Sequence, residues 1–178
     1  MQTVDILVLH HIKGIGNKAQ VALIGCYKDD HLNSLEDLLE LDLNQTATPK
    51  RAVKLLEEFF ANDLYEVTKA ECESDLEMWL TEGITVSALG SDSYPLQLTA
   101  LEDPPALLFC KGNLNLLSSS KSITVVGTRE NTHLGERITR KTVGHFSQSD
   151  FCIVSGLARG IDTIAHRTAL ENNGTTIA

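Results

Sequence analysis

The sequence predicts a two-part α/β fold, in which a small helical domain precedes an open, mostly parallel sheet. Two observations support this prediction. Apolar residues recur at helical spacing up to about residue 82. From Ser122 onward, β-branched runs and helical patterns alternate as β-α-β-α-β, which is typical of a Rossmann-like sheet. We therefore place a helical domain at residues 1–82 and the N-terminal part of a Rossmann-like domain at residues 83–178.

Two short helices are predicted over residues 4–25, joined by the turn Gly14-Ile15-Gly16. This pattern is typical of a helix-hairpin-helix or SAM-like unit, and such a glycine turn presents main-chain N–H groups to a DNA phosphate. A plain packing unit with a tight turn is the alternative. The alternative is favoured because only Lys13 and Lys18 supply positive charge nearby.

Three further helices complete the predicted helical domain. The first covers residues 34–43 with Ser34 as its N-cap, and the second opens at Thr48-Pro49, with the threonine as N-cap. The third runs over residues 66–81 and ends at Gly83 as the C-cap glycine. Its acidic residues are interpreted as a solvated face, and a docking face for a basic partner is the alternative.

The strands and helices beyond Gly83 follow from runs of β-branched residues separated by turn residues. Strands are predicted over residues 84–89, 106–110, 123–126, 151–154 and 174–178, and helices over residues 132–147 and 160–172. Because the last three strands alternate with two helices, they are expected to form a parallel sheet.

Composition favours a soluble cytoplasmic protein with reduced thiols. No apolar stretch reaches the length of a membrane helix, and the N-terminus lacks the pattern of a signal peptide. The cysteines form no C-x-x-C pair and the histidines are scattered, so we expect buried thiols and no metal site. The cysteines are Cys26, Cys72, Cys110 and Cys152.

The net charge of −9 argues against nucleic acid when it is taken alone. The acidic residues, however, are concentrated in residues 1–100, with 7 Lys and Arg against 17 Asp and Glu. Residues 101–178 have 8 against 7. Because salt screens charges beyond about 8–10 Å, a local basic patch decides phosphate binding. The candidates for such a patch are Arg129, Arg137, Arg140, Lys141, Arg159 and Arg167.

The first candidate binding loop leaves the strand at residues 123–126. Ligands of open α/β sheets bind beyond the carboxyl ends of the strands. Gly127 allows the chain to turn sharply, Thr128 can bond a phosphate oxygen, and Arg129 offers a planar fork of donors that matches a phosphate. The loop lacks the G-x-G-x-x-G pattern, which argues against an NAD enzyme.

The second candidate loop leaves the strand at residues 151–154. Ser155 and Gly156 allow a ligand close to the main chain, and Arg159 adds a cation ahead of Gly160. Turn geometry alone is the alternative role of Gly127, Gly156 and Gly160.

Two further residues of this segment invite interpretation. Asp162 is expected to cap the helix or pair with Arg159, and His166 to be a hydrogen-bonded structural residue. A hydrolase with Ser155 as nucleophile and His166 as base is disfavoured, because the G-x-S-x-G elbow is absent.

These two loops carry a resemblance to a known family. V-G-T-R-x-x-T-x-x-G at 126–135 and S-G-L-A-R-G-I-D-x-x-A-H-R-x-A-L at 155–170 resemble the signature stretches of the DNA-processing protein A (DprA/Smf) family. Residues 94–98 and 103–108 are similar to the entry into that family's α/β domain. The resemblance covers about residues 84–178, and the N-terminal helices fit the family's small helical domain loosely.

The resemblance implies a non-enzymatic protein that binds and protects single-stranded DNA and helps to load the RecA recombinase during natural transformation. It implies no cofactor and a homodimer at full length. Arg129 would hold a backbone phosphate, and Gly127 and Thr128 would shape its loop. The remaining residues of the same pocket would be Ser155, Gly156, Arg159 and Gly160.

The family's sheet continues beyond three strands, so the resemblance also implies that this chain is truncated at Ala178. This piece alone is then expected to bind DNA weakly, because further pocket residues would lie beyond Ala178, and to aggregate or pair through its open sheet edge. The sequence shows no element that would read bases, so little base specificity is expected. Aromatic residues for stacking are scarce, at 5% of the chain, and none lies in either loop. Any stacking platform for bases is expected beyond residue 178.

Two other function classes remain open on sequence grounds. One is a nucleotide-binding or nucleotide-hydrolysing Rossmann-like enzyme, which would resemble the phosphoribohydrolases, although their P-G-G-x-G-T-x-x-E stretch is absent. The other is an interaction module driven by the acidic helical domain, which predicts no affinity for nucleic acid.

Overall fold

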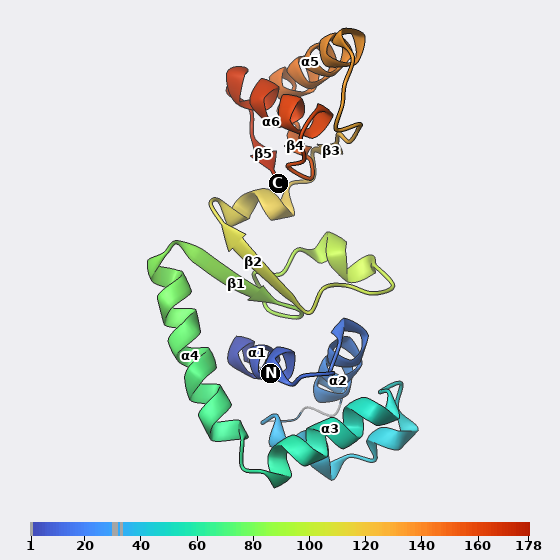
Figure 1. Ribbon diagram of the computed structural model, residues 1–178, viewed down its shortest axis with the longest axis vertical. Helices are drawn as coiled ribbons and strands as arrows, with labels where there is room; N and C mark the ends of the chain where they lie inside the picture. The colour runs from blue at the N-terminus through green and yellow to red at the C-terminus, as the bar shows by residue number, and fades with distance from the viewer. Residues whose placement is uncertain (1, 30–31, 33) are drawn as a thin grey trace. The chain divides into compact units, whose positions relative to one another are not determined.

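The computed structural model describes residues 2–29, 32 and 34–178 and divides the chain into two compact units. The first unit is Met1–Gly112 and the second is Asn113–Ala178; Figure 1 draws the first in blue to yellow and the second mainly in orange and red. The change from helix to strand at Gly83 thus lies inside the first unit. Among the described residues, no helix is long and apolar enough to cross a membrane.

The first unit contains the helices that the sequence predicts on either side of the glycine turn, and two more. They are α1 (Thr3–His11), α2 (Asn17–Asp29), α3 (Lys50–Ala61) and α4 (Tyr65–Thr81). The main core of this unit joins all four helices. The acidic residues of α4 are exposed or half-exposed, as a solvated face requires.

Helix α1 is buried on all sides rather than along one stripe. Its residues Val4–Leu9 are all buried, including the carboxylate of Asp5. The hydroxyl of Tyr65 donates to Asp5 Oδ1 at 3.1 Å, and the main-chain N–H of Gln2 donates to Asp5 Oδ2 at 2.9 Å. Burial, together with this neighbouring carboxylate, raises the pKa of Tyr65. The buried carboxylate is therefore satisfied by one hydrogen bond from the N-cap of its own helix and one from α4.

The α-helix predicted to begin at Ser34 is wrong, since this segment forms two short 3-10 helices, Glu36–Glu40 and Leu43–Gln45. The hydroxyl and main-chain N–H of Ser34 donate to the Asp37 carboxylate at 2.7 and 2.9 Å. The N–H of Asp37 donates to the hydroxyl oxygen of Ser34 at 3.3 Å, which is the predicted N-cap contact, but Leu41 is extended, with φ −84° and ψ 145°. This extended residue ends the first 3-10 helix after Glu40.

Two predicted helix ends are tested by the structure. Helix α3 begins at Lys50 with Pro49 as its N-cap, so the cap lies one residue beyond the predicted Thr48. The C-cap glycine of α4 is confirmed. Gly83 has φ +75°, and its N–H donates to the carbonyl of Leu80 at 3.0 Å.

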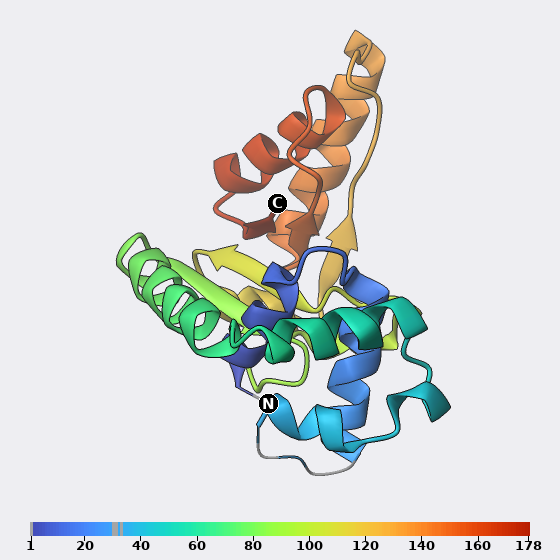
Figure 2. The ribbon, with the colours of Figure 1, turned by 60° about the horizontal axis from the view of Figure 1, so that its bottom comes forward.

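An antiparallel hairpin of β1 (Ile84–Ala88) and β2 (Leu107–Lys111) follows α4. It belongs to the first unit because it packs on the helices, as Figure 2 shows. The side chain of Asn17 donates to Asp103 at 2.6 Å and to the carbonyl of Pro104 at 2.9 Å, and accepts from the N–H of Ala106 at 2.8 Å. These contacts are tertiary, so a local pattern cannot reveal them.

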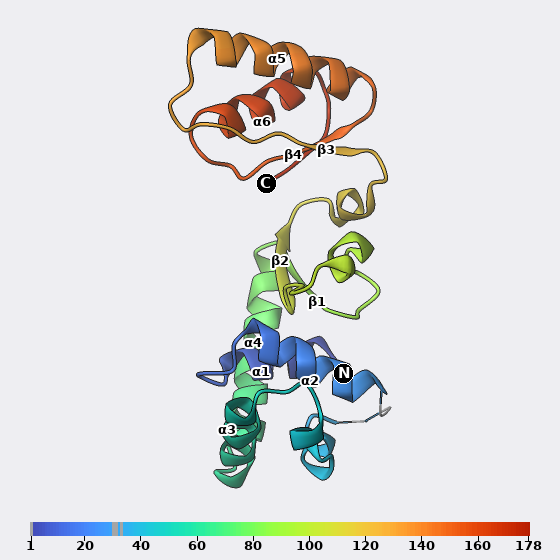
Figure 3. The same cartoon turned by 90° about the vertical axis from the view of Figure 1, so that its right-hand side faces the viewer.

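The second unit is a three-stranded parallel sheet in the order β3-β4-β5. The elements are β3 (Ser122–Thr124), α5 (His133–Gln148), β4 (Cys152–Val154), α6 (Ile161–Glu171) and β5 (Thr176–Ile177). Both helices cover the same face (Figure 3), as expected when successive crossovers of one hand advance along a sheet in one direction. Ile153 of β4 is fully buried against Val143 of α5 and Ala165 of α6. The predicted β-α-β-α-β order is thus confirmed.

The cysteines are free thiols, but only two of them are buried. Cys72 and Cys152 lie in the interior, while Cys26 and Cys110 are half-buried, which corrects the expectation of four buried thiols. Burial, together with the acidic residues around it on α4, raises the pKa of Cys72 to about 11. Within the described ranges, no group of three or more His, Cys, Asp or Glu side chains is arranged to hold a metal ion.

Candidate nucleic-acid interface

The two loops predicted from the sequence lie side by side at the carboxyl ends of β3 and β4. The N–H of Val125 donates to the carbonyl of Val154 at 2.9 Å, which extends the parallel pairing by one step beyond β3. The hydroxyl of Ser155 then donates to the carbonyl of Val125 at 2.7 Å. Farther along, the N–H of Ile161 donates to the carbonyl of Thr128 at 3.1 Å. The second loop is therefore bonded to the first at both of its ends.

Two features require glycine at position 160: its backbone angles and the close approach of the two loops. Its φ of 85° and ψ of −129° lie where residues with a Cβ atom are rarely found. A Cβ atom at this position would lie 2.2 Å from the carbonyl oxygen of Thr128 and 2.8 Å from Cα of Arg129. The main chain of Thr128 and Arg129 is therefore packed directly against Gly160.

Gly127, on the first loop, lies at a second close approach between the two loops. A Cβ atom at Gly127 would lie 2.7 Å from Cβ of Ile161, an atom that cannot rotate away. Gly156 is less tight, since its Cβ would lie 3.1 Å from the carboxylate of Asp162. Turn geometry alone therefore does not explain Gly127 and Gly160, because both allow the loops to pack against each other.

The second loop is held on the first turn of α6. Asp162 is only 6% exposed and accepts a hydrogen bond from the N–H of Gly156 at 3.2 Å. The hydroxyl and N–H of Thr163 donate to the carbonyl of Ala158 at 2.6 and 3.1 Å. In the described part of the chain, Asp162 makes no ion pair with Arg159. The carboxylate thus anchors the loop and leaves that arginine uncommitted.

His166 and Ser155 both have structural partners. The hydroxyl of Thr176 donates to the carbonyl of Ile153 at 2.8 Å, so its oxygen accepts from Nδ1 of His166 at 2.7 Å. The hydroxyl of Ser155 is already directed at a main-chain carbonyl. These contacts agree with a structural histidine and give no support to a serine nucleophile activated by a histidine.

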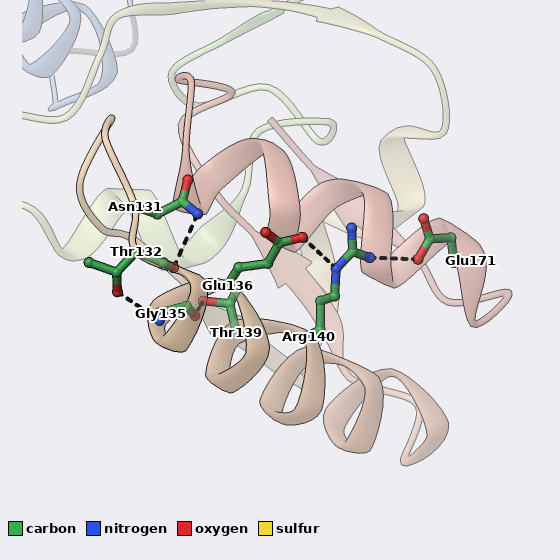
Figure 4. A network of polar contacts seen from close by, with 7 residues as sticks. All are labelled: Asn131, Thr132, Gly135, Glu136, Thr139, Arg140 and Glu171. Carbon is green, nitrogen blue, oxygen red and sulfur yellow. Dashed lines mark hydrogen bonds and ion pairs between the residues drawn. The ribbon is translucent and has the colours of Figure 1, made fainter.

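Arg129 and Arg159 are exposed cations on the two loops. Neither has an ion-pair partner among the residues that the structure describes. Arg140 differs, since its guanidinium donates to Glu136 and to Glu171, each at 3.0 Å (Figure 4). Arg140 is therefore neutralised within the unit, which corrects its place among the candidates for a basic patch.

Main-chain N–H groups of the two loops are candidate phosphate ligands in addition to the two arginines. The N–H groups of residues 127–129 and 157–160 have no hydrogen-bond partner toward any described residue. In contrast, the N-terminus of α5 is capped, because Thr132 Oγ1 accepts from the N–H of Gly135 at 3.1 Å (Figure 4). The loops combine free N–H groups with free guanidinium groups, which is an arrangement suited to phosphate oxygens.

Replacing Ser155 with alanine is expected to destabilise the second unit by about 1–2 kcal/mol, because the carbonyl of Val125 loses a partly buried hydrogen bond. Urea unfolding followed by circular dichroism measures this loss. Ser149→Ala is the matched control, since its hydroxyl also donates to a main-chain carbonyl, that of His145, but is exposed. Equal losses in the two variants would contradict the linking role of Ser155.

Fold and loops together define a Rossmann-like α/β protein with a helical unit ahead of its sheet. The family model of DNA recombination-mediator protein A matches residues 85–178. The chain therefore belongs to this family, and the resemblance to DprA/Smf proteins is confirmed.

Individual relatives agree with this assignment. The chain is 47% identical over 87 residues to DNA processing protein DprA of Streptococcus pneumoniae, a match covering 49% of this chain and 30% of that protein. It is 33% identical over 165 residues to protein Smf of Borreliella burgdorferi, covering 79% of this chain and 51% of that protein. The X-ray structure of DprA from Streptococcus pneumoniae superimposes on all of this chain and on 57% of its own, with a TM-score of 0.74 and 28% identity. The match to DNA processing protein DprA of Bacillus subtilis covers about a third of that relative.

Proposed function

We propose that the two loops bind the sugar-phosphate backbone of single-stranded DNA. The observation that carries this proposal is the meeting of free main-chain N–H groups with Arg129 and Arg159 on two loops bonded to each other. Gly127, Thr128, Gly156 and Gly160 shape the loops, and Ser155 links them. Phosphate binding needs neither a metal nor a catalytic group, and the proposal includes neither.

The proposed biological role is that of a recombination mediator. The family's description names this role, and the relatives are called DNA processing proteins. We accordingly propose that the full-length protein protects single strands in the cytoplasm, forms a homodimer and helps to load RecA. A flexible single strand can present successive phosphates to both loops, which supports a single-stranded over a duplex ligand.

A nucleotide-binding enzyme remains the alternative, because the same donors would also suit the phosphates of a mononucleotide. Catalysis would need an uncommitted acid, base or nucleophile close to the loops. The hydroxyl of Ser155 is committed to a structural hydrogen bond. Nε2 of His166 has no hydrogen-bond partner among the described residues, but it is buried and shielded from solvent. The commitment of Ser155 and the burial of His166 support DNA binding over nucleotide hydrolysis.

Fluorescence anisotropy of labelled oligo-dT, titrated with this chain at increasing salt, tests the proposal. We expect binding that weakens as salt rises, because phosphate contacts release counterions. Unlabelled ATP is the competitor for the alternative and is expected to displace little of the labelled strand. No binding at low salt, either by this chain or by a chain extended beyond Ala178, would contradict the proposal.

A further inference from the structure

Leu157 is an apolar side chain held out into solvent at the centre of the second loop. It is 67% exposed, and its φ of 55° places the main chain in the left-handed region. A residue with a Cβ atom adopts this conformation at a free-energy cost. Leu157 recovers little of this cost by burial, and strained residues of this kind cluster at ligand sites.

The conformation of Leu157 is imposed by its neighbours. On one side, the N–H of Gly156 is bonded to the buried carboxylate of Asp162. On the other side, the carbonyl of Ala158 accepts from both the hydroxyl and the N–H of Thr163. The peptides before Gly156 and after Ala158 are therefore fixed on the first turn of α6, and Leu157 lies in the short exposed span between them.

A second exposed apolar side chain lies on the neighbouring loop. Val126 is 70% exposed and directly follows Val125, whose carbonyl accepts from the hydroxyl of Ser155. Leu157 lies two residues beyond that serine. The hydrogen bond between the loops thus holds the main chains near both residues at one edge of the sheet, on the loops that also carry Arg129 and the free N–H groups.

This edge of the sheet offers both charged and apolar groups, and a nucleotide likewise has a charged phosphate and a largely apolar base. Guanidinium and N–H groups suit the phosphates, while aliphatic surface suits the flat face of a base or a sugar. Leu157 and Val126 have no side-chain donor or acceptor, so they cannot read the edges of bases. Contact with them would favour any base over none.

We propose that Leu157, together with Val126, forms an apolar seat for a nucleobase of the strand whose phosphates the loops hold. The inference rests on the proposed function and adds a base contact to it. It places a platform for bases on the loops themselves, whereas the scarcity of aromatic residues in the sequence suggests one elsewhere. Sequence reasoning misses Leu157 because nothing in its local pattern reveals its backbone conformation.

The test compares oligo-dT with an abasic strand of equal length, for the unmodified chain and for Leu157→Asn. Asparagine tolerates the left-handed conformation and has a similar size, so the loop is expected to keep its shape. The unmodified chain is expected to prefer oligo-dT by about fivefold, the lower end for stacking contacts. Leu157→Asn should bind both strands with the affinity of the unmodified chain for the abasic strand, and with an unchanged salt dependence.

Leu170→Asn is the matched control, since Leu170 is 62% exposed in the last turn of α6, away from the loops. It should leave both affinities unchanged. Leu157→Gly removes the side chain and relieves the strained φ, so it gives the same comparison if the asparagine variant does not fold. Circular dichroism checks the fold of each variant.

The outcomes separate the base seat from the proposed function. If the unmodified chain binds both strands equally well, phosphate binding stands and the base seat is overturned. If Leu157→Asn weakens both strands to the same degree, Leu157 shapes the backbone site instead, and the base seat is again overturned. If the unmodified chain binds neither strand, the proposed function and this inference fail together.

Discussion

Gly160→Ala is expected to destabilise the unit Asn113–Ala178 by about 3 kcal/mol or more, a sum of backbone strain and overpacking. The strain arises because the backbone angles of Gly160 disfavour any Cβ atom. The overpacking arises because the new methyl group would meet the main chain of Thr128 and Arg129, which cannot rotate away. Chemical unfolding followed by circular dichroism measures the loss of stability.

Gly83→Ala separates the two causes. Gly83 also has a positive φ, of 75°, but apart from its chain neighbours no atom of the described residues lies within 4 Å of its Cβ position. This variant therefore carries backbone strain without a clash and is expected to lose roughly 1 kcal/mol. Equal losses in the two variants would show that the loops do not approach each other as closely as described.

Arg129→Ala and Arg159→Ala are expected to weaken oligo-dT binding by roughly tenfold each, since each removes a charge-assisted hydrogen bond to a phosphate. The dependence of log affinity on log salt should become shallower by about 0.7 for each phosphate of a single strand that is no longer neutralised. Arg129→Lys retains the charge but not the planar fork, so it should restore the salt dependence and only part of the affinity. Anisotropy titrations at several salt concentrations measure both quantities.

Arg140→Ala is the matched control for these arginines. It removes the same charge from the same unit, but Arg140 is already paired with Glu136 and Glu171. We expect little change in DNA affinity. A decrease as large as that of Arg129→Ala would indicate that net charge, and not the loops, governs binding.

The elements of the second unit are predictable from the sequence because their signals are local. A β-branched run marks β3, the capping Thr132 marks the start of α5, and Gly160 marks the start of α6. The segment after Ser34 carries an equally good local signal, yet Leu41 is extended and the helix stops. The hydrogen bonds from Asn17 of α2 to the segment before β2 also cannot be predicted from local sequence, since they join distant parts of the chain.

The loops of the candidate site are predictable, whereas their internal contacts are not. The order strand, loop, helix places both loops at one sheet edge and identifies Arg129 and Arg159 as candidate cations. Local spacing does not reveal that Gly160 supports the main chain of Arg129 or that Asp162 holds Gly156. Nor does it reveal that Arg140 is paired. Each of these facts depends on which atoms meet after folding.

The hydrogen bond from the N–H of Ile161 to the carbonyl of Thr128 has a consequence for protein engineering and for divergence within the family. The carbonyl of the peptide between Thr128 and Arg129 accepts from the first turn of α6. The two loops therefore have to be transferred together when they are grafted onto another protein. Replacing residues 126–135 by an unrelated loop that lacks a glycine at the position of Gly127 would place a Cβ atom against Ile161. Exchanging residues 126–135 and 155–170 together for a pair of loops that already pack on each other preserves the joint, so a chimera that takes such a pair is expected to fold where a chimera that takes one unrelated loop does not.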